Sequence, residues 1–177
     1  MNIAVYCSSS NHIAENYLKS GSKLGEWIAE NGHTLVFGGA TGGLMSSVSK
    51  AAYDKNGSII GVIPQAVINM NRQSPYCSEL ITLKTMGERK EKMKEISDVF
   101  VVLPGSYGTL DELFDVTASG IVGEHKKKII IVNENGFYDD LLKLIARMRS
   151  EKFIPVEVFK PIIVSDISSC IMALNQA

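Results

Sequence analysis

Arg89 is a charged residue at a position in this sequence where a charge needs a partner. It lies in the charged segment Met86–Ile96, at helical spacing from Met93 and Ile96, so a helix would turn it inward with these apolar side chains. A buried guanidinium requires a protein carboxylate or a bound phosphate, and its planar fork matches the oxygens of both. An arginine that buries only its stem and keeps its head in water explains the spacing equally well.

Glu112 follows the glycine-rich turn Leu103–Thr109 (LPGSYGT) and admits two interpretations that are compatible with each other. In the first, Thr109 is the N-cap and Glu112 the third residue of a capping box. In the second, the carboxylate faces a sugar and stabilises the oxocarbenium-like transition state of glycosidic cleavage. Asp115, three residues further on, is expected to raise the pKa of Glu112 by like-charge repulsion.

Two glycine-rich turns join an apolar strand to a helix, at Phe37–Met45 (FGGATGGLM) and at 103–109. Ligands of open α/β sheets bind beyond the carboxyl ends of the strands, where helix-start amides favour an anion. The two turns together therefore predict a ligand that carries a phosphate. Ala40 breaks the GxGxxG pattern and no P-loop lysine is present, which disfavours NAD and nucleoside triphosphates. The alternative is that the glycines only permit tight turns.

The elements that must position these residues alternate between short apolar runs and helical patterns. Strands are predicted at Ile3–Cys7, Thr34–Phe37, Ser58–Ile63, Leu80–Leu83, Val99–Leu103, Ile129–Val132 and Pro161–Val164. Helices are predicted at 14–30, 43–55, 86–97, 109–121, 138–150 and 166–175. This alternation predicts an α/β fold, a three-layer α/β/α sandwich with a mostly parallel central sheet, as a single domain over residues 1–177. The irregular stretch Pro64–Ser78 is either part of a site or a surface excursion.

Composition excludes several classes of function. The net charge of −1 over 177 residues gives no basic field, so neither nucleic acid nor a membrane surface is an expected partner. The three cysteines form no CxxC and the three histidines are scattered, so no metal site or disulfide framework is expected. The N-terminal residues do not have the pattern of a signal peptide, and we expect a cytoplasmic protein.

Three motifs of the sequence, taken together, resemble the LOG ("lonely guy") family over about residues 2–155. They are Gly38-Gly39-(x3)-Gly43-Leu44-Met45, Met86-(x2)-Arg89-Lys90-(x2)-Met93 and Pro104-Gly105-(x2)-Gly108-Thr109-(x2)-Glu112. Enzymes of that family are cytokinin riboside 5′-monophosphate phosphoribohydrolases, long mislabelled as lysine decarboxylases. The resemblance implies a Rossmann-like homodimer that hydrolyses a nucleoside 5′-monophosphate to free base and ribose 5-phosphate, without a cofactor.

The resemblance also implies the roles of individual residues. Arg89 and Glu112 match the catalytic pair of the family. The positions that match the nucleotide-binding residues are Gly39, Thr41, Gly42, Met86, Lys90, Gly105, Ser106, Tyr107, Gly108, Thr109, Leu110, Asp111 and Thr117. No residue matches a metal ligand.

The chain departs from the family pattern at several positions near these motifs. Ser106 and Ser46 replace glycines, Gly87 replaces a histidine, Asn71 stands at an acidic position, and Ala118 takes the place of a tryptophan. The base that the enzyme selects therefore stays open among a cytokinin nucleotide, AMP and other monophosphates.

Two other functions remain as alternatives. A nucleotide or molybdenum-cofactor carrier on the same scaffold needs phosphate-binding loops but no carboxylate at the sugar. A pyridoxal-phosphate lysine decarboxylase needs a Schiff-base lysine in a cofactor pocket, and no lysine with a buried sequence context stands at a strand end where such a pocket would form. Fold resemblance alone does not choose between such functions.

Overall fold

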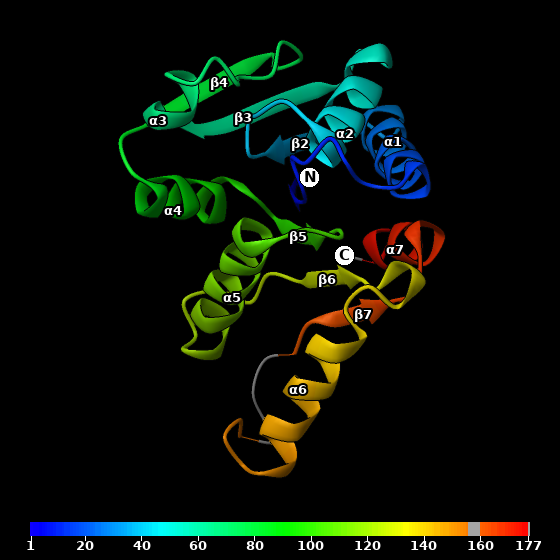
Figure 1. Cartoon of the computed structure of the whole chain (residues 1–177), viewed down its shortest axis with the longest axis vertical. Coiled ribbons are helices and arrows are strands. Elements are labelled where there is room, and N and C mark those ends of the chain that lie inside the picture. The colour runs from blue at the N-terminus through cyan, green and yellow to red at the C-terminus, as the bar shows by residue number, and fades with distance from the viewer. Residues whose placement is uncertain (156–159, 177) are drawn as a thin grey trace.

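The computed structural model describes residues 1–155 and 160–176, so residues 156–159 and 177 of the predicted domain lie outside the described residues. Its centre is one parallel sheet of seven strands in the order β4-β3-β2-β1-β5-β6-β7 (Figure 1). The strands are β1 (Asn2–Tyr6), β2 (Thr34–Phe37), β3 (Ser58–Pro64), β4 (Glu79–Leu83), β5 (Val99–Val102), β6 (Ile129–Val132) and β7 (Ile162–Val164). Each begins and ends within one residue of its predicted bounds.

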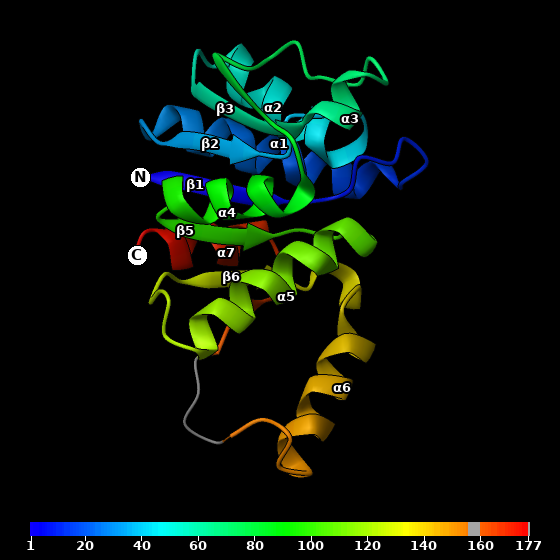
Figure 2. The same cartoon turned by 90° about the vertical axis from the view of Figure 1, so that its left-hand side faces the viewer.

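Helices cover both faces of the sheet and complete the predicted three-layer sandwich (Figure 2). They are α1 (Glu15–Glu30), α2 (Gly43–Asp54), α3 (Gln65–Ile68), α4 (Met86–Ile96), α5 (Tyr107–Ile121), α6 (Asp139–Ser150) and α7 (Ile167–Leu174), with a 3-10 turn η1 (Glu134–Gly136). Figures 1 and 2 show α1, α2 and α7 on one face and α4 and α5 on the other, with α6 extending away from the sheet. The sequence did not predict α3 or η1, because each is too short to show a helical period.

The core consists of two apolar clusters, one on each face of the sheet. Successive residues of a strand point to opposite faces. Ile3 and Val5 of β1 therefore pack with α1, α2 and α7, whereas Ala4 and Tyr6 pack with Met93 of α4 and the apolar side of α5. Strands buried on both faces explain why their sequences are continuous apolar runs rather than alternating patterns.

The strand order reverses between β1 and β5, which lie side by side in the middle of the sheet. From β1 to β4, each successive strand is added toward one edge of the sheet, and from β5 to β7, each is added toward the other edge. The loops that leave β1 and β5 diverge at such a point and leave a crevice at the carboxyl edge. The fold thus predicts where a ligand would bind.

The stretch Pro64–Ser78 is folded back onto the first glycine-rich turn rather than projecting from the surface. It contains α3 and an isolated antiparallel bridge between Ala40 and Gln73. Ser74 donates its backbone N–H to the carbonyl of Gly39 at 2.8 Å. The loop therefore covers the carboxyl end of β2, beside the crevice.

Candidate active site

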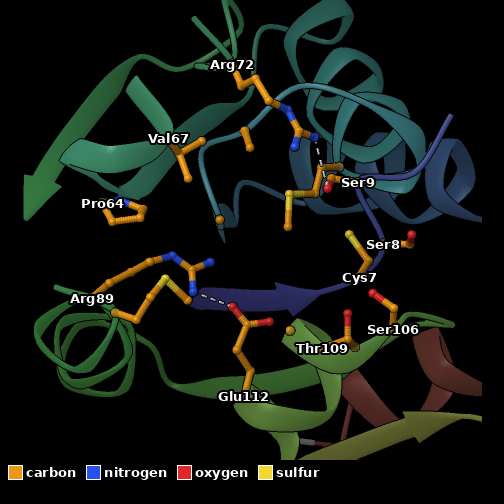
Figure 3. A pocket seen from close by; sticks show the side chains of 15 residues that line it. Cys7, Ser8, Ser9, Pro64, Val67, Arg72, Arg89, Ser106, Thr109 and Glu112 are labelled. Carbon is orange, nitrogen blue, oxygen red and sulfur yellow. Dashed lines mark hydrogen bonds and ion pairs between the residues drawn. The ribbon is translucent and has the colours of Figure 1, made fainter. Parts of the chain in front are cut away.

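A cavity of about 160 Å³ lies at the carboxyl edge of the sheet, at the switch point between β1 and β5 (Figure 3). Residues at and after the ends of β1, β2, β3 and β5, the first turn of α4 and the first two turns of α5 form its walls. Of the predicted site residues, the cavity wall includes Met86, Arg89, Ser106, Gly108, Thr109 and Glu112. Gly38, Ala40 and Met45 of the wall belong to the first glycine-rich turn. Wall residues that were not singled out from the sequence are Cys7, Ser8, Ser9, Pro64, Val67 and Arg72.

Arg89 and Glu112 form an ion pair inside this cavity. The Nη1 of Arg89 lies 2.6 Å from Oε1 of Glu112, and the two side chains are 5% and 4% exposed. The Nε of Arg89 donates a second hydrogen bond to the carbonyl of Val62, at 2.9 Å. The predicted inward orientation of Arg89 is confirmed, and its partner is a protein carboxylate. The interpretation with a solvent-exposed arginine head is wrong.

Two features of helix α4 fix the position of Arg89: a capping box at the start of the helix and the buried side chain of Met93. Thr85 is its N-cap and Glu88 its third residue, and both reciprocal hydrogen bonds of a capping box are present. One turn after Arg89, the fully buried Met93 packs against the sheet and sets the rotation of the helix. The guanidinium therefore enters the cavity from a helix whose start and rotation are both determined.

The predicted capping box at Thr109 and Glu112 is wrong. Helix α5 begins at Tyr107, and its N-cap is Ser106, which makes no side-chain capping bond. Thr109 is thus the third residue of the helix, where it is buried against Gly105, and Glu112 lies in the second turn. The carboxylate is therefore free of a capping role and faces the cavity.

Burial raises the pKa of Glu112 above its ordinary value of 4.5, against the opposing effect of Arg89. Asp111 adds a smaller upward contribution. The predicted contribution of Asp115 is wrong, since Asp115 is not among the causes of this shift. Asp115 pairs instead with Lys90 at 3.4 Å and with Lys94 at 3.2 Å. The dominant cause is desolvation, which comes from the tertiary packing and not from a neighbour along the helix.

The two glycine-rich turns differ in how their amides are used. At the start of α2, the protein itself supplies acceptors: Ser46 Oγ for Gly42 N at 2.7 Å and Asn11 Oδ1 for Gly43 N at 3.0 Å. A Cβ on Gly42 would lie 2.3 Å from the carbonyl of Ser9, so this glycine permits a close approach of two protein backbones. For the first turn, the interpretation of the glycines as packing residues is therefore favoured.

The start of α5 offers free amides instead. In the described part of the chain, no acceptor meets the backbone N–H groups of Tyr107, Gly108 and Thr109. Gly108 and Thr109 line the cavity, together with the hydroxyl of Ser106. A helix of 15 residues thus points uncapped amides at the cavity, an arrangement that favours an anion.

The remaining predicted site residues lie outside the walls of this cavity. Lys90 pairs with Asp111 at 2.7 Å beside it, and Tyr107 is 91% exposed. Gly105 lines a neighbouring apolar cavity of about 230 Å³, and Thr117 lines another of about 310 Å³ between α5 and α6. The others that are not part of the wall are Gly39, Thr41, Gly42 and Leu110.

Arg72 is the charged cavity residue that the sequence alone did not indicate. It follows Asn71, in a stretch without periodicity, so no local pattern marks it. Its position depends on the return of the loop onto β2, which is a tertiary contact. The signal that the sequence does offer is the irregular stretch Pro64–Ser78, which was predicted to be either part of a site or a surface excursion.

Within residues 1–155 and 160–176, no group of three or more His, Cys, Asp or Glu side chains is placed to hold a metal ion. The cysteines of the described chain, Cys7, Cys77 and Cys170, are unpaired. No helix in the same residues combines the length and apolar character that crossing a bilayer requires.

Comparison with known proteins identifies relatives of the chain. The family model described as "Possible lysine decarboxylase" matches residues 45–173. The cytokinin riboside 5′-monophosphate phosphoribohydrolase LOG of Oryza sativa subsp. japonica is 38% identical, over 91% of this chain and 66% of the rice protein. The cytokinin riboside 5′-monophosphate phosphoribohydrolase of Mycobacterium tuberculosis is 42% identical, over 78% of this chain and 74% of that protein.

A solved structure shares the fold at lower sequence identity. The molybdenum cofactor carrier protein of Chlamydomonas reinhardtii superposes with a TM-score of 0.76 over 99% of this chain and 96% of its own, at 23% identity. At that identity the likeness concerns the fold alone.

Proposed function

This chain belongs to the LOG family of phosphoribohydrolases, and we propose that it hydrolyses the N-glycosidic bond of a nucleoside 5′-monophosphate. The products are the free base and ribose 5-phosphate. The observation that carries the proposal is the buried Arg89–Glu112 pair, which lines the same cavity as the free amides at the start of α5. A phosphate site and a carboxylate within one small cavity suit a substrate with both a phosphate and a sugar.

The phosphate binds at the amino end of α5 in this proposal. The amides of Gly108 and Thr109 and the hydroxyl of Ser106 supply donors, and the helix dipole adds attraction for a dianion. The binding energy of the phosphate then positions the glycosidic bond over the carboxylate. Energy from such a remote group raises the rate as well as the affinity.

Glu112 stabilises the positive charge that develops on the ribose as the bond breaks. A water oxygen bonds to C1′, the bond from C1′ to the base nitrogen breaks, and the proton released by the water balances the charge on the leaving base. The Glu112 side chain is 4% exposed, so its carboxylate acts on that charge with little screening. Arg89 keeps Glu112 oriented and opposes the upward effect of burial on its pKa.

The geometry favours hydrolysis over the two alternatives. A carrier requires no buried carboxylate in its binding cavity, whereas Glu112 is placed there at the cost of desolvation. A pyridoxal-phosphate decarboxylase requires a lysine in the cavity. Among the described residues, none that lines it is a lysine.

We also propose that the chain functions as a homodimer, through the surface of α5 and α6. No residue of α6 is fully buried, and Leu144 and Phe114 of this surface are 53% and 45% exposed. Between the two helices lies the apolar cavity of about 310 Å³, where the Oγ1 of Thr117 is buried without a hydrogen-bond partner. A second copy on this surface would cover the apolar residues and could supply a hydrogen-bond partner for the Thr117 hydroxyl.

We further propose that the protein works in a reducing compartment such as the cytoplasm, which the three unpaired cysteines support.

The test of the function is a panel of purified substrates. The protein is incubated with AMP, a cytokinin riboside 5′-monophosphate, other nucleoside monophosphates and the matching nucleosides, and the free base is measured. We expect release of base from at least one monophosphate and none from its nucleoside. Equal cleavage of AMP and adenosine would show that the phosphate is not part of recognition, and cleavage of none would return the protein to the carrier class.

A further inference from the structure

Arg72 reaches over the cavity from the loop between α3 and β4 (Figure 3). Its Nη2 donates to the Oγ of Ser9 at 3.2 Å and to the carbonyl of Thr41 at 3.3 Å. No carboxylate of the described chain pairs with it, whereas Arg89, the other arginine of the cavity, has Glu112. Two long hydrogen bonds to neutral oxygens leave most of the donors of this guanidinium available.

The backbone around Arg72 holds it in place independently of its side chain. Its carbonyl accepts from the backbone N–H of Thr41 at 2.7 Å and from the Thr41 hydroxyl at 3.2 Å. On the next residue, Gln73 forms the antiparallel bridge to Ala40. A change of the Arg72 side chain therefore leaves the loop and the cavity wall in position, which makes its role separable from folding.

Among the charged residues of the described chain that line the cavity, Arg72 is the one without an opposite charge beside it. Arg89 and Glu112 neutralise each other at 2.6 Å, so the wall carries one excess positive charge. In Figure 3 the guanidinium points toward the side of the cavity with Ser9, away from Val67. The hydroxyls of the cavity lie on that same side, and the apolar wall lies on the other; the hydroxyl residues are Ser8, Ser9, Ser106 and Thr109.

We propose that Arg72 is a second phosphate-binding residue, which faces the α5 amino end across the hydroxyl-lined part of the cavity and holds the 5′-phosphate of the substrate there. The proposal rests on the proposed function, since it names how that site distinguishes a nucleotide from a nucleoside. A phosphate between the guanidinium and the α5 amides replaces two long neutral bonds with charge-assisted ones. Arg72 thereby selects phosphorylated substrates, and the apolar wall receives the base.

Binding by calorimetry tests this role separately from catalysis. The ligands are AMP, ribose 5-phosphate and adenosine, with Glu112→Gln as the background that prevents turnover of AMP. Arg72→Gln removes the charge and Arg72→Lys keeps it. Lys55→Gln is the control, because it removes one exposed cation that pairs with Glu30 far from the cavity.

In Arg72→Gln we expect binding of AMP and ribose 5-phosphate to weaken by about 10-fold or more, the range for a lost hydrogen bond to a charged group. Adenosine binding stays unchanged, Arg72→Lys lies between, and Lys55→Gln binds like the parent. In the active background, Arg72→Gln raises KM for AMP more than it lowers kcat.

Equal affinity of Arg72→Gln and the parent for ribose 5-phosphate would overturn the role of Arg72 while leaving the proposed hydrolysis intact. A wild-type protein that binds AMP but cleaves no monophosphate of the panel would overturn the hydrolysis, and the Arg72 comparison would then stand on binding alone. A wild-type protein that binds neither ribose 5-phosphate nor any monophosphate of the panel would overturn both.

Discussion

Arg89 of α4 and Glu112 of α5 meet at 2.6 Å in a cavity where their side chains are 5% and 4% exposed. Each charge has lost most of its hydration, so each depends on the other for compensation. This mutual dependence joins stability and the proposed catalysis at one place. Substitutions that separate the two effects are therefore informative.

Glu112→Gln preserves the shape of the side chain and removes its charge. We expect kcat for the best monophosphate to fall by about 10²-fold or more, because the charge that opposes the developing cation is lost. Stability at neutral pH should not fall, since the raised pKa of Glu112 means that folding favours its neutral form. Steady-state kinetics and thermal melting measure the two effects.

Glu95→Gln is the control, because Glu95 lies on the exposed side of α4 and pairs only with Lys92 in the described chain. It should match the wild type in both measurements. Near-wild-type turnover by Glu112→Gln would leave Glu112 a structural residue, and the carrier function would then lead.

Replacing both charges tests whether the pair is retained for stability. Arg89→Met or Glu112→Leu alone leaves one buried charge unpaired, and we expect each to lose about 3–5 kcal/mol of unfolding free energy. The double substitution removes both charges, so most of that loss should be recovered, with no turnover. Denaturant unfolding measures it. A double variant no more stable than the single ones would show that hydrophobic residues cannot replace the pair here.

Gly38→Ala perturbs the pair without touching either charge. A Cβ on Gly38 would lie 2.6 Å from Nη2 of Arg89 and 2.8 Å from the terminal carbon of Met45, both ends of flexible side chains. We expect the guanidinium to shift, kcat/KM to fall by about 10- to 100-fold, and stability to change by less than about 1 kcal/mol.

Gly87→Ala is the matched control on α4. The nearest atom to its new Cβ is Thr85 Oγ1 at 3.8 Å, so the change is sterically free. Alanine has the higher helix propensity, and stability should rise by up to about 1 kcal/mol with unchanged activity. Equal kinetic effects of the two substitutions would contradict the steric explanation.

The pH dependence follows from the raised pKa of Glu112. If the ionised carboxylate is the active form, the acid limb of kcat/KM inflects above the ordinary value of 4.5. For stability, a raised folded-state pKa means that the folded protein binds the proton more tightly. The contribution of Glu112 is therefore present below its unfolded pKa and decreases as pH rises through the folded pKa.

Unfolding free energy measured from pH 4 to pH 8 should show this decrease in the wild type relative to Glu112→Gln. An acid limb at or below the ordinary value would mean that Arg89 outweighs burial in setting the pKa.

Phe114→Asp tests the proposed dimer. It introduces a charge into the apolar surface of α5 and α6, where Phe114 is 45% exposed, and we expect a monomeric mass in light scattering. Met172→Asp, on α7 at the other face of the sheet, replaces a residue of 59% exposure and should leave the mass unchanged. A monomeric wild type at micromolar concentration would count against the dimer itself.

The spacing of apolar residues was enough to predict every strand and the longer helices. Buried runs such as Ile129–Val132 are continuous because both faces of a parallel strand are covered. The inward orientation of Arg89 was likewise predictable, because it depends only on the helical period that it shares with Met93. Such features are local, and the sequence contains them.

Helix starts were less predictable, because capping-box spacing also occurs at a place where no capping box forms. Thr85 with Glu88 and Thr109 with Glu112 have equal capping-box spacing, but only the first pair forms the box. The second fails because α5 already begins at Tyr107, with its first amides facing the cavity. Whether the capping box forms at α5 therefore depends on the path by which the chain leaves β5, and not on the motif.

The residues that meet across the cavity were decided by the tertiary structure. The sequence by itself placed Arg89 on the inward stripe of a helix, with an exposed head as an equal alternative, and placed a glycine-rich turn before Glu112. That the two pair, and that Arg72 lies over them, follows from the strand order around β1 and β5 and from the return of the loop onto β2. Strand order is set by how two apolar clusters pack on opposite faces of one sheet, a property of the whole chain that no local spacing encodes.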